Sequence, residues 1–247
     1  MNSLRIEERG DRMVVTLDRP EKRNAIDAGM VAELHELCAT LEQHPKLLLL
    51  TGGTDGIFAG GADIGQLRDR GRMDALAAIN VGVFERLRRL PMPTLAALDG
   101  PALGGGAELA YACDLRICTS RTFFGQPEVK LGIIAGAGAT YRLPALIGEA
   151  LAKELLFTGR RVPAAEALAI RLVNRVVEEP GELLVAAHSL LDEIAGGSAL
   201  ALRLTKLAVD APAAHPAAEL LAQAVLFEDE EKRERMDEFL SRRQRPR

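Results

Sequence analysis

The chain has 247 residues, 48% hydrophobic and 27% charged, with a formal charge of −4; this excludes a wholly disordered protein and argues against a general electrostatic binder of nucleic acid. The three cysteines form no C-x-x-C pair, so neither a disulfide framework nor a zinc knuckle is expected. No apolar run approaches the roughly 20 residues that span a bilayer, and the charged first residues lack an apolar signal segment, so we expect a cytoplasmic protein with no membrane partner.

Hydrophobic patterns divide the first fifty residues into three short elements. Residues 3–18 are typical of a β-hairpin whose turn contains Gly10. A helix is predicted from Asp27, a good N-cap, to about Gln43, because apolar residues recur there every three or four positions. The run 46–53 is almost continuously apolar and ends in glycine, which is typical of a strand buried on both faces.

Strands and helices are predicted to alternate through the middle of the chain. A glycine-rich loop at 53–65 precedes a predicted helix at about 72–90 and a strand at 94–99. A glycine-rich turn then leads into a short apolar helix within 100–113, and one or two short strands follow at 114–125. This alternation predicts β-α-β units and stacked parallel strands, and therefore an α/β fold.

The second half of the chain has a different pattern. From about residue 139 onward it is almost entirely helical, with interruptions at glycine and proline. We therefore expect an α/β core over residues 1–195 and a helical C-terminal region over 196–247. The apolar surface of the helices from about 180 to 227 exceeds what one small region can cover, which favours assembly with other copies of the chain.

Several common catalytic signatures are missing from the sequence. His35 and Glu36 begin like a zinc-binding helix, but Ala39 stands where the second histidine is needed, so no metal site is expected. No serine lies in a G-x-S-x-G motif, and neither common nucleotide phosphate loop is present. A serine hydrolase and a nucleotide-binding loop are therefore not supported.

Two glycine-rich loops, each after a predicted strand and each near an acid, give the strongest functional signal. They are FAGGADIGQL at 58–67 and GPALGGGAELAYACD at 100–114. Glycine inside a helix costs roughly 1 kcal/mol relative to alanine, and a close approach of the backbone to another group is a physical reason to tolerate it. The first N–H groups of a helix have no acceptor within the helix and point away from its N-terminus. A backbone N–H group in the Gly104–Gly106 turn can therefore bind an oxyanion.

Two glutamates accompany these loops. Glu108 lies three residues after Gly105, on the same helix face and in an otherwise apolar segment. Glu128 follows Pro127, which favours an extended chain before it. Taken alone, Glu108 is also compatible with a helix-edge acid paired with an arginine, and Glu128 with a surface acid. Their joint placement beside two candidate oxyanion loops favours paired acid–base catalysis.

Several segments together resemble the enoyl-CoA hydratase/isomerase (crotonase) superfamily over nearly the whole chain. The resemblance rests on RPEKRNAI (19–26), FAGGADI (58–64), GPALGGGAELAYACDLRI (100–117), FGQPEVKLGIIAGAG (124–138), the stretch 154–173 that begins ELLFTGR, and MDEFLSRR (236–243). It implies a crotonase-like core of stacked β-β-α spirals and a C-terminal helical trimerisation region. The implied assembly is a homotrimer or a homohexamer.

The same resemblance implies a binding site for an acyl-CoA thioester. The N–H groups of Ala62 and Gly105 would form the oxyanion hole, and Glu108 and Glu128 would be the catalytic acids. The implied substrate contacts are Ala62, Asp63, Ile64 and Gly65 along the acyl-CoA path, and also Gly136. Lys22 and Arg23 would lie near the CoA nucleotide, and Arg242 near the CoA phosphates.

The activity that the resemblance implies is that of an enoyl-CoA hydratase, a lyase of fatty acid β-oxidation that adds water across the 2,3 double bond. It needs no metal or redox cofactor. Glu128 would protonate Cα, and Glu108 would position and activate the water. An enoyl-CoA isomerase, or another crotonase-type acyl-CoA lyase, is the alternative on the same oxyanion hole. The two intact glutamates disfavour a non-catalytic acyl-CoA binder, and the mixed charges of 228–243 disfavour RNA binding.

Overall fold

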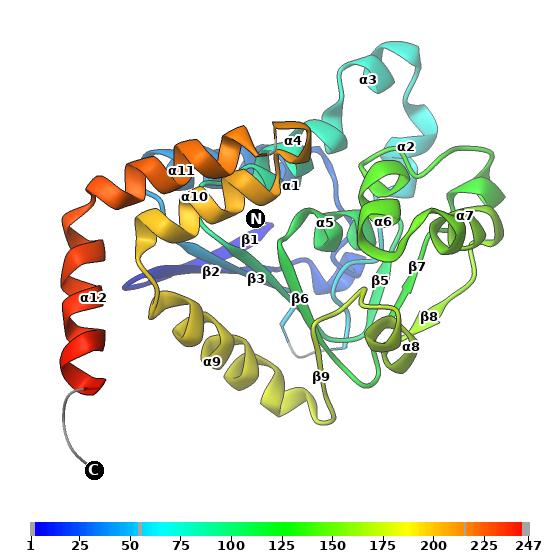
Figure 1. The fold of residues 1–247 in the computed structure, drawn as a ribbon. Coiled ribbons are helices and arrows are strands. Elements are labelled where there is room, and N and C mark those ends of the chain that lie inside the picture. The colour runs from blue at the N-terminus through cyan, green and yellow to red at the C-terminus, as the bar shows by residue number, and fades with distance from the viewer. Residues whose placement is uncertain (1–2, 54–55, 215, 244–247) are drawn as a thin grey trace. The chain divides into compact units, whose positions relative to one another are not determined.

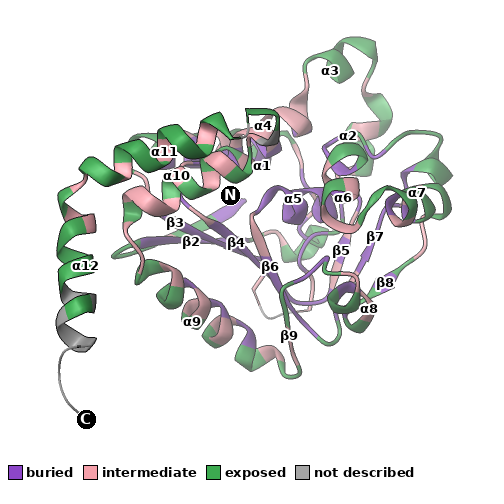
Figure 2. Ribbon diagram, viewed as in Figure 1, coloured by how far each residue is buried: buried purple, intermediate pink, exposed green. Residues whose placement is uncertain are grey.

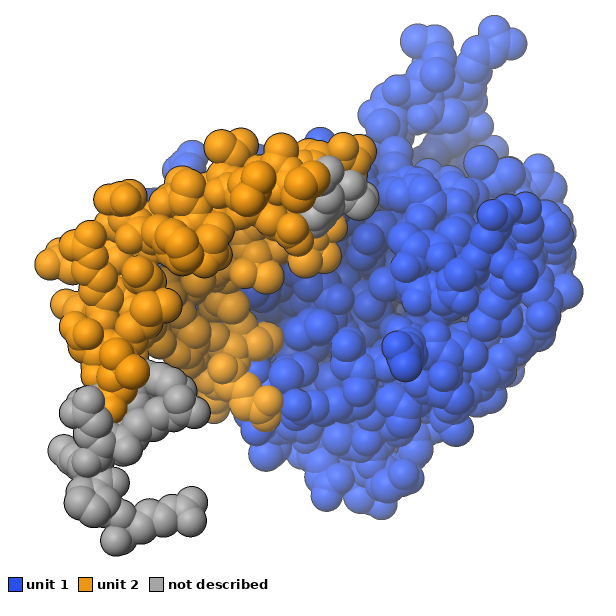
Figure 3. Space-filling model, viewed as in Figure 1, with its two compact units in different colours: residues 1–191 blue, residues 192–247 orange. Residues whose placement is uncertain are grey.

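The computed structural model describes residues 3–53, 56–214 and 216–243. It divides into two compact units, residues 1–191 and 192–247, which are coloured separately in Figure 3. The expected domain boundary between residues 195 and 196 stays a prediction. Within the described ranges no single helix is long and apolar enough to cross a membrane, although two helical segments, Pro180–Ala195 and Ala199–Val209, pass that test when taken together.

The main sheet of the first unit has six strands, in the order β1-β2-β3-β4-β6-β9 (Figure 1). Its first two strands form the predicted antiparallel hairpin, and all later neighbours pair in parallel. Every residue of β3 and β4 is buried, which explains their continuous apolar sequence. The strands are β1 (Leu4–Arg9), β2 (Arg12–Leu17), β3 (Leu47–Thr51), β4 (Thr94–Leu98), β6 (Leu115–Thr119) and β9 (Arg175–Val177).

A second sheet contains three short strands in the order β5-β7-β8. They are β5 (Pro101–Leu103), β7 (Phe123–Gly125) and β8 (Val162–Pro163). Along the chain, β4 is followed by β5 and then a helix, and β6 is followed by β7 and then helical turns. A bridge between Ala59 and Ala102 gives β3 the equivalent continuation. The chain therefore winds through strand–strand–helix turns, and the expected β-β-α spiral is confirmed.

The helices of the first unit pack in a series, α1 on α4, α4 on α5, α5 on α6 and α6 on α7. Asp27 caps α1 by accepting a hydrogen bond from the N–H of Met30, as predicted. The helices are α1 (Ala28–Gln43), α2 (Ile64–Asp69), α3 (Arg72–Leu76), α4 (Ile79–Arg88), α5 (Gly105–Ala112), α6 (Ala139–Ile147), α7 (Glu149–Thr158) and α8 (Ala164–Ala169), with 3-10 turns η1 (Pro20–Lys22), η2 (Glu128–Leu131) and η3 (Pro180–Glu182). The helix α9 (Leu183–Ala195) begins in the first unit and ends in the second.

The structure corrects three of the predicted elements. The single helix predicted at 72–90 is two helices, α3 and α4, because the chain takes a left-handed conformation at Ala78, with φ of 55°. The glycine-rich segment 100–113 also contains β5, whose three residues are too few to show a period. The region after residue 139 is not wholly helical, since it contributes β8 and the edge strand β9.

The second unit is helical throughout its described elements, which agrees with the predicted C-terminal helical region. It contains α10 (Ala199–Val209), η4 (Pro212–Ala214), α11 (Ala217–Glu228) and α12 (Glu230–Arg243). Within α10 and α11, whose residues are all described, no residue is buried, and Figure 2 shows both helices as exposed or intermediate. A role of this unit in trimerisation stays a prediction.

Candidate active site

The loop of residues 56–63, between β3 and α2, presents the N–H of Ala62. The N–H of Ile26 donates to the carbonyl of Gly61 at 2.8 Å, and the N–H of Asp63 donates to the carbonyl of Ile26 at 3.0 Å. Because these flanking groups face Ile26, the N–H of Ala62 points to the opposite side. No hydrogen bond within the described part of the chain uses it. Ala62 therefore offers one free donor.

A second backbone donor lies next to it at the start of α5. The N–H of Gly105, the first residue of the helix, has no carbonyl one turn earlier to bind. A Cβ built on Gly105 would lie only 3.4 Å from the nitrogen of Ala62. The turn is fixed because the N–H of Gly104 donates to the carbonyl of Gly125 at 2.9 Å. The structure thus brings together the two N–H groups predicted to form an oxyanion hole.

Close packing explains the glycines on either side of Gly105. The backbone of Gly104 has φ of 50° and ψ of −126°, and a Cβ there would lie 2.8 Å from Oε1 of Glu128. A Cβ on Gly106 would lie 2.3 Å from the carbonyl oxygen of Ala59. Without side chains at these positions, α5 can approach both the 56–63 loop and the carboxyl group of Glu128.

Glu108 lies in the first turn of α5 and is only 4% exposed. Its Oε1 accepts hydrogen bonds from the N–H groups of Ala137 at 2.8 Å and Ala139 at 3.0 Å, at the start of α6. Burial raises the pKa of Glu108 to about 7; the nearby charge of Glu128 also raises the pKa, and the backbone donors lower it. Backbone N–H groups, rather than the arginine considered as an alternative, therefore hold this carboxyl group.

Glu128 begins η2 directly after Pro127 and is 9% exposed. The amide nitrogen of Gln126 donates to both carboxyl oxygens of Glu128 at 3.1 Å, and the Gln126 side chain also hydrogen bonds the hydroxyl of the buried Tyr111. Burial raises the pKa of Glu128. Sequence reasoning missed Gln126 and Tyr111. The only available signal was a lone amide two residues before Glu128, and its burial becomes evident only from the fold.

The two carboxyl groups form an electrostatically coupled pair. Both are removed from solvent, and the charge of Glu128 contributes to the raised pKa of Glu108. Burial favours the protonated form of each carboxyl group, and the charge of Glu128 adds to this effect on Glu108. The structure thus gives two buried carboxyl groups, one of which lies against the turn that carries the Gly105 donor.

Comparison with known proteins identifies the family. The family described as enoyl-CoA hydratase/isomerase matches residues 8–246 of the chain. The chain belongs to this family. It is 39% identical over 214 residues to the short-chain-enoyl-CoA hydratase of Clostridium acetobutylicum, a match that covers 85% of this chain and 82% of that protein. The family resemblance found in the sequence is thereby confirmed.

Solved structures agree with the fold. The enoyl-CoA hydratase from Bacillus anthracis superimposes with a TM-score of 0.91 at 30% identity, covering 97% of this chain and 96% of that one. A Thermobifida fusca protein solved in complex with acetoacetyl-CoA gives a TM-score of 0.83 at 30% identity, covering 91% of this chain and 94% of that one. The predicted crotonase-like α/β fold is confirmed.

The predicted acyl-CoA path runs from the oxyanion loop into α2. The side chain of Asp63 caps α2 by accepting a hydrogen bond from the N–H of Gln66 at 3.0 Å, so it also has a structural role. Ile64 is 61% exposed, and Gly65 follows it in the same helix. Gly136 is exposed and directly precedes Ala137, whose N–H binds Glu108. Substrate contact by these residues stays a prediction.

The predicted CoA-binding residues lie at both ends of the chain. Lys22 and Arg23 are exposed at the end of η1, and the carbonyl of Arg23 accepts a hydrogen bond from the N–H of Gly60 at 2.9 Å. This contact ties their loop to the oxyanion loop. The side chain of Arg242 lies outside the described residues. Binding of CoA by all three stays a prediction.

Proposed function

We propose that this family member is an enoyl-CoA hydratase, which adds water reversibly across the 2,3 double bond of a 2-enoyl-CoA. The observation that carries the proposal is the pairing of two buried carboxyl groups, Glu108 and Glu128, with two free N–H groups, those of Ala62 and Gly105. The name of the Clostridium relative and the acetoacetyl-CoA bound to the Thermobifida neighbour support an acyl-CoA thioester as the substrate.

The two N–H groups would receive the thioester carbonyl oxygen. Attack of water at Cβ moves an electron pair onto that oxygen, and both donors stabilise the negative charge of the enolate. The loss of one such donor typically reduces the rate by about 10²–10³-fold. Because the donors belong to the Ala62 backbone and the α5 terminus, they are held in place before the substrate binds.

The positions of the two acids support different roles. Glu128 lies against Gly104, next to the donor of Gly105, and Cα of the substrate is one bond from the carbonyl carbon. Glu128 therefore gives its proton to Cα. Glu108, held by the N–H groups at the start of α6, orients the water and takes its proton while the oxygen bonds to Cβ. Return of the proton from Glu108 to Glu128 regenerates both groups, so the steps balance as the addition of one water and need no metal or redox cofactor.

A substrate panel tests this function. Purified protein is mixed with 2-enoyl-CoA thioesters from C4 to C16, and hydration is followed as the loss of absorbance of the conjugated thioester. We expect turnover, and the name of the Clostridium relative favours the short end of the series. Conversion of a 3-enoyl-CoA without any hydration would instead establish isomerisation, the other reaction in the family description. No reaction with either class would contradict an enzymatic function.

The same proposal includes assembly as a homotrimer or homohexamer. It is supported by the exposed apolar side chains of α10 and α11, which are Leu207, Val209, Leu220, Leu221, Val225 and Phe227. These helices have the composition of a buried interface without being buried in one chain. A cytoplasmic location and a role in β-oxidation stay predictions.

A further inference from the structure

The Ala62 donor depends on a contact between two segments that are distant in the sequence. Residues 19–26 lie along the 56–63 loop, and the bridge between Ile26 and Ala62 leaves the N–H of Ala62 on the side away from Ile26, with its nitrogen 3.4 Å from a Cβ built on Gly105. The N–H of Gly60 also donates to the carbonyl of Arg23. The direction of the Ala62 N–H is therefore set by how residues 19–26 and the loop are held together.

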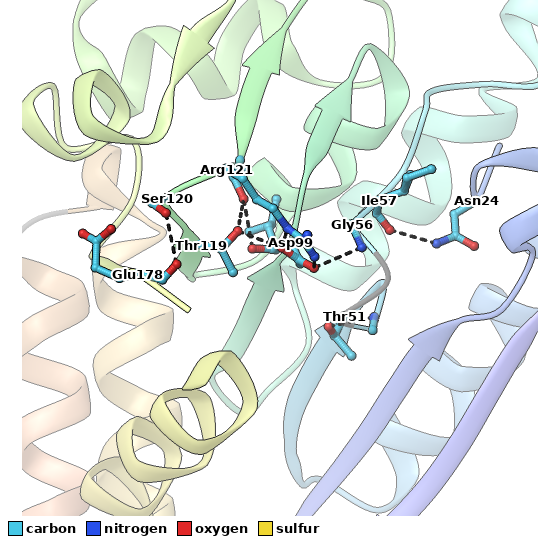
Figure 4. Close-up of polar contacts among 12 residues, drawn as sticks. Asn24, Thr51, Gly56, Ile57, Asp99, Thr119, Ser120, Arg121 and Glu178 are labelled. Carbon is cyan, nitrogen blue, oxygen red and sulfur yellow. Dashed lines mark hydrogen bonds and ion pairs between the residues drawn. The ribbon is translucent and has the colours of Figure 1, made fainter. Parts of the chain in front are cut away.

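Asn24 is the buried side chain that joins these two segments. It is 3% exposed, and its Nδ2 donates to the carbonyls of Ile57 at 3.2 Å and Phe58 at 3.0 Å. Its Oδ1 accepts a hydrogen bond from the N–H of Arg19 at 2.8 Å. Figure 4 shows the Asn24 amide directed at Ile57 across the gap between the two segments.

The backbone of Asn24 reinforces this assignment. Its φ of 52° lies in the left-handed region, where asparagine is one of the few residues with a side chain that is well tolerated. Two residues later, Ile26 forms the bridge to Ala62. Asn24 thus acts on both partners of the bridge: it fixes the turn that delivers Ile26, and it holds the loop four residues before Ala62.

We propose that Asn24 is a positioning residue for the oxyanion hole, acting through the Ile26–Ala62 bridge rather than by touching the substrate. The proposal rests on the proposed hydratase function, because the Ala62 N–H matters only if an oxyanion forms beside it. Loss of the Asn24 side chain should reduce the stabilisation of the enolate more than the binding of CoA. The proposal therefore predicts a fall in kcat with little change in KM.

Asp99 provides a control that contacts the same loop without touching the bridge. Its fully buried carboxyl group accepts hydrogen bonds from the N–H of Gly56 at 3.0 Å and from the hydroxyl of Thr119 at 2.8 Å. It also forms a salt bridge with Arg121 (Figure 4). These contacts join the beginning of the loop to the ends of β4 and β6. Asp99→Asn should therefore lower the melting temperature and leave kcat within about threefold of wild type.

The test uses two variants of Asn24 in the full chain. Asn24→Asp keeps the acceptor for Arg19 but places an oxygen against the carbonyls of Ile57 and Phe58. Asn24→Gly keeps the left-handed backbone and removes the side chain, so it serves if the first variant does not fold. We expect each folded variant to lose about tenfold or more in kcat for crotonyl-CoA, with KM changed by less than about threefold.

A spectroscopic readout separates positioning from a merely structural role. An aryl 2-enoyl-CoA with an electron-donating amino group on the ring absorbs at longer wavelength when N–H donors polarise its carbonyl. We expect the red shift on binding to be smaller in the Asn24 variants than in wild type and in Asp99→Asn. A full red shift and wild-type kcat, with only a lower melting temperature, would overturn the proposal. The red shift is measured without turnover. A wild-type protein that binds the probe but does not hydrate crotonyl-CoA would therefore contradict the hydratase function and leave the result on Asn24 readable.

Discussion

The helix α5 and the helices α10 and α11 all contain several alanines, but they have opposite surroundings. All eight residues of α5 are buried, including the charged Glu108, whereas α10 and α11 have no buried residue. Segments of the same chain cover the first helix: the 56–63 loop packs on its glycines, and the N–H groups of Ala137 and Ala139 donate to its carboxyl group.

The difference shows that apolar composition does not determine which surface is covered. In α5 the glycine run permits close packing, and the resulting burial raises the pKa of Glu108. In α10 and α11 the large apolar side chains are exposed to solvent, and the proposed assembly would cover them. Substitutions in α5 should therefore affect chemistry or the fold of one chain, and substitutions in α10 and α11 should affect assembly.

The largest expected effect is on catalysis. Glu108→Gln and Glu128→Gln should each lower kcat for hydration by at least about 10²-fold, in line with the contribution of general acid–base catalysis. The melting temperature should hold or rise, because a buried carboxylate opposes folding and glutamine keeps an acceptor oxygen. Glu149→Gln, at an exposed position in α7, is the control and should leave kcat unchanged. Unfolding of either active-site variant would contradict the expectation that neither glutamate is needed for the fold.

The next effect concerns the packing of α5. Gly106→Ala places a Cβ 2.3 Å from the carbonyl oxygen of Ala59, and we expect it to lower the free energy of unfolding by about 3 kcal/mol. Gly181→Ala is the matched control, because a Cβ there meets nothing within 4 Å. Denaturant titration of both variants measures the difference. Equal free energies of unfolding for the two variants would show that the 56–63 loop does not pack closely against α5.

The third prediction concerns assembly through the exposed side chains of α10 and α11. Light scattering should give a trimer or hexamer for the wild-type protein, and Leu221→Glu, at a side chain that is 70% exposed, should shift it toward smaller species. Leu76→Glu makes the same change at a residue of α3 that is 72% exposed, and it should leave the mass unchanged. A wild-type monomer at micromolar concentration would contradict the proposed assembly.

The smallest effect is a dependence of stability on pH. The folded pKa of Glu108 lies at about 7, above its ordinary 4.5, so the folded state holds this proton more tightly than the unfolded state. The resulting stabilisation is complete below about 4.5 and is lost as the pH rises through about 7. The melting temperature should fall between about pH 5 and 8, and less so in Glu108→Gln. An identical slope in both proteins would show that Glu108 is not the group responsible.

Local signals in the sequence predicted most of the core. The hairpin, α1 with its Asp27 cap, β3 and β4 carry clear periods or continuous apolar runs. The short strands β5 and β8 were missed because two or three residues show no period, and β9 because it lies within a largely helical stretch. The break at Ala78 carries no glycine or proline to announce it.

Only part of the candidate site could be predicted from the sequence. Glu108 is visible in the sequence because it interrupts an apolar segment, Glu128 because it follows Pro127, and the glycine runs because glycine is costly where a helix begins. Gln126 and Asn24 were not assigned roles, because their partners lie on other segments and only folding joins them. The raised pKa of Glu108 likewise depends on burial, which a single helix sequence does not specify.

The most direct test of the two-acid mechanism is a double-mutant cycle on hydration. Turnover of crotonyl-CoA is measured for Glu108→Gln, Glu128→Gln and the protein that carries both changes. If the acids act as one unit, the double variant should be no more than about tenfold slower than the slower single variant. Losses that multiply, or near-full hydration by Glu108→Gln while Glu128→Gln is inactive, would contradict the two-acid mechanism and make isomerisation the leading function.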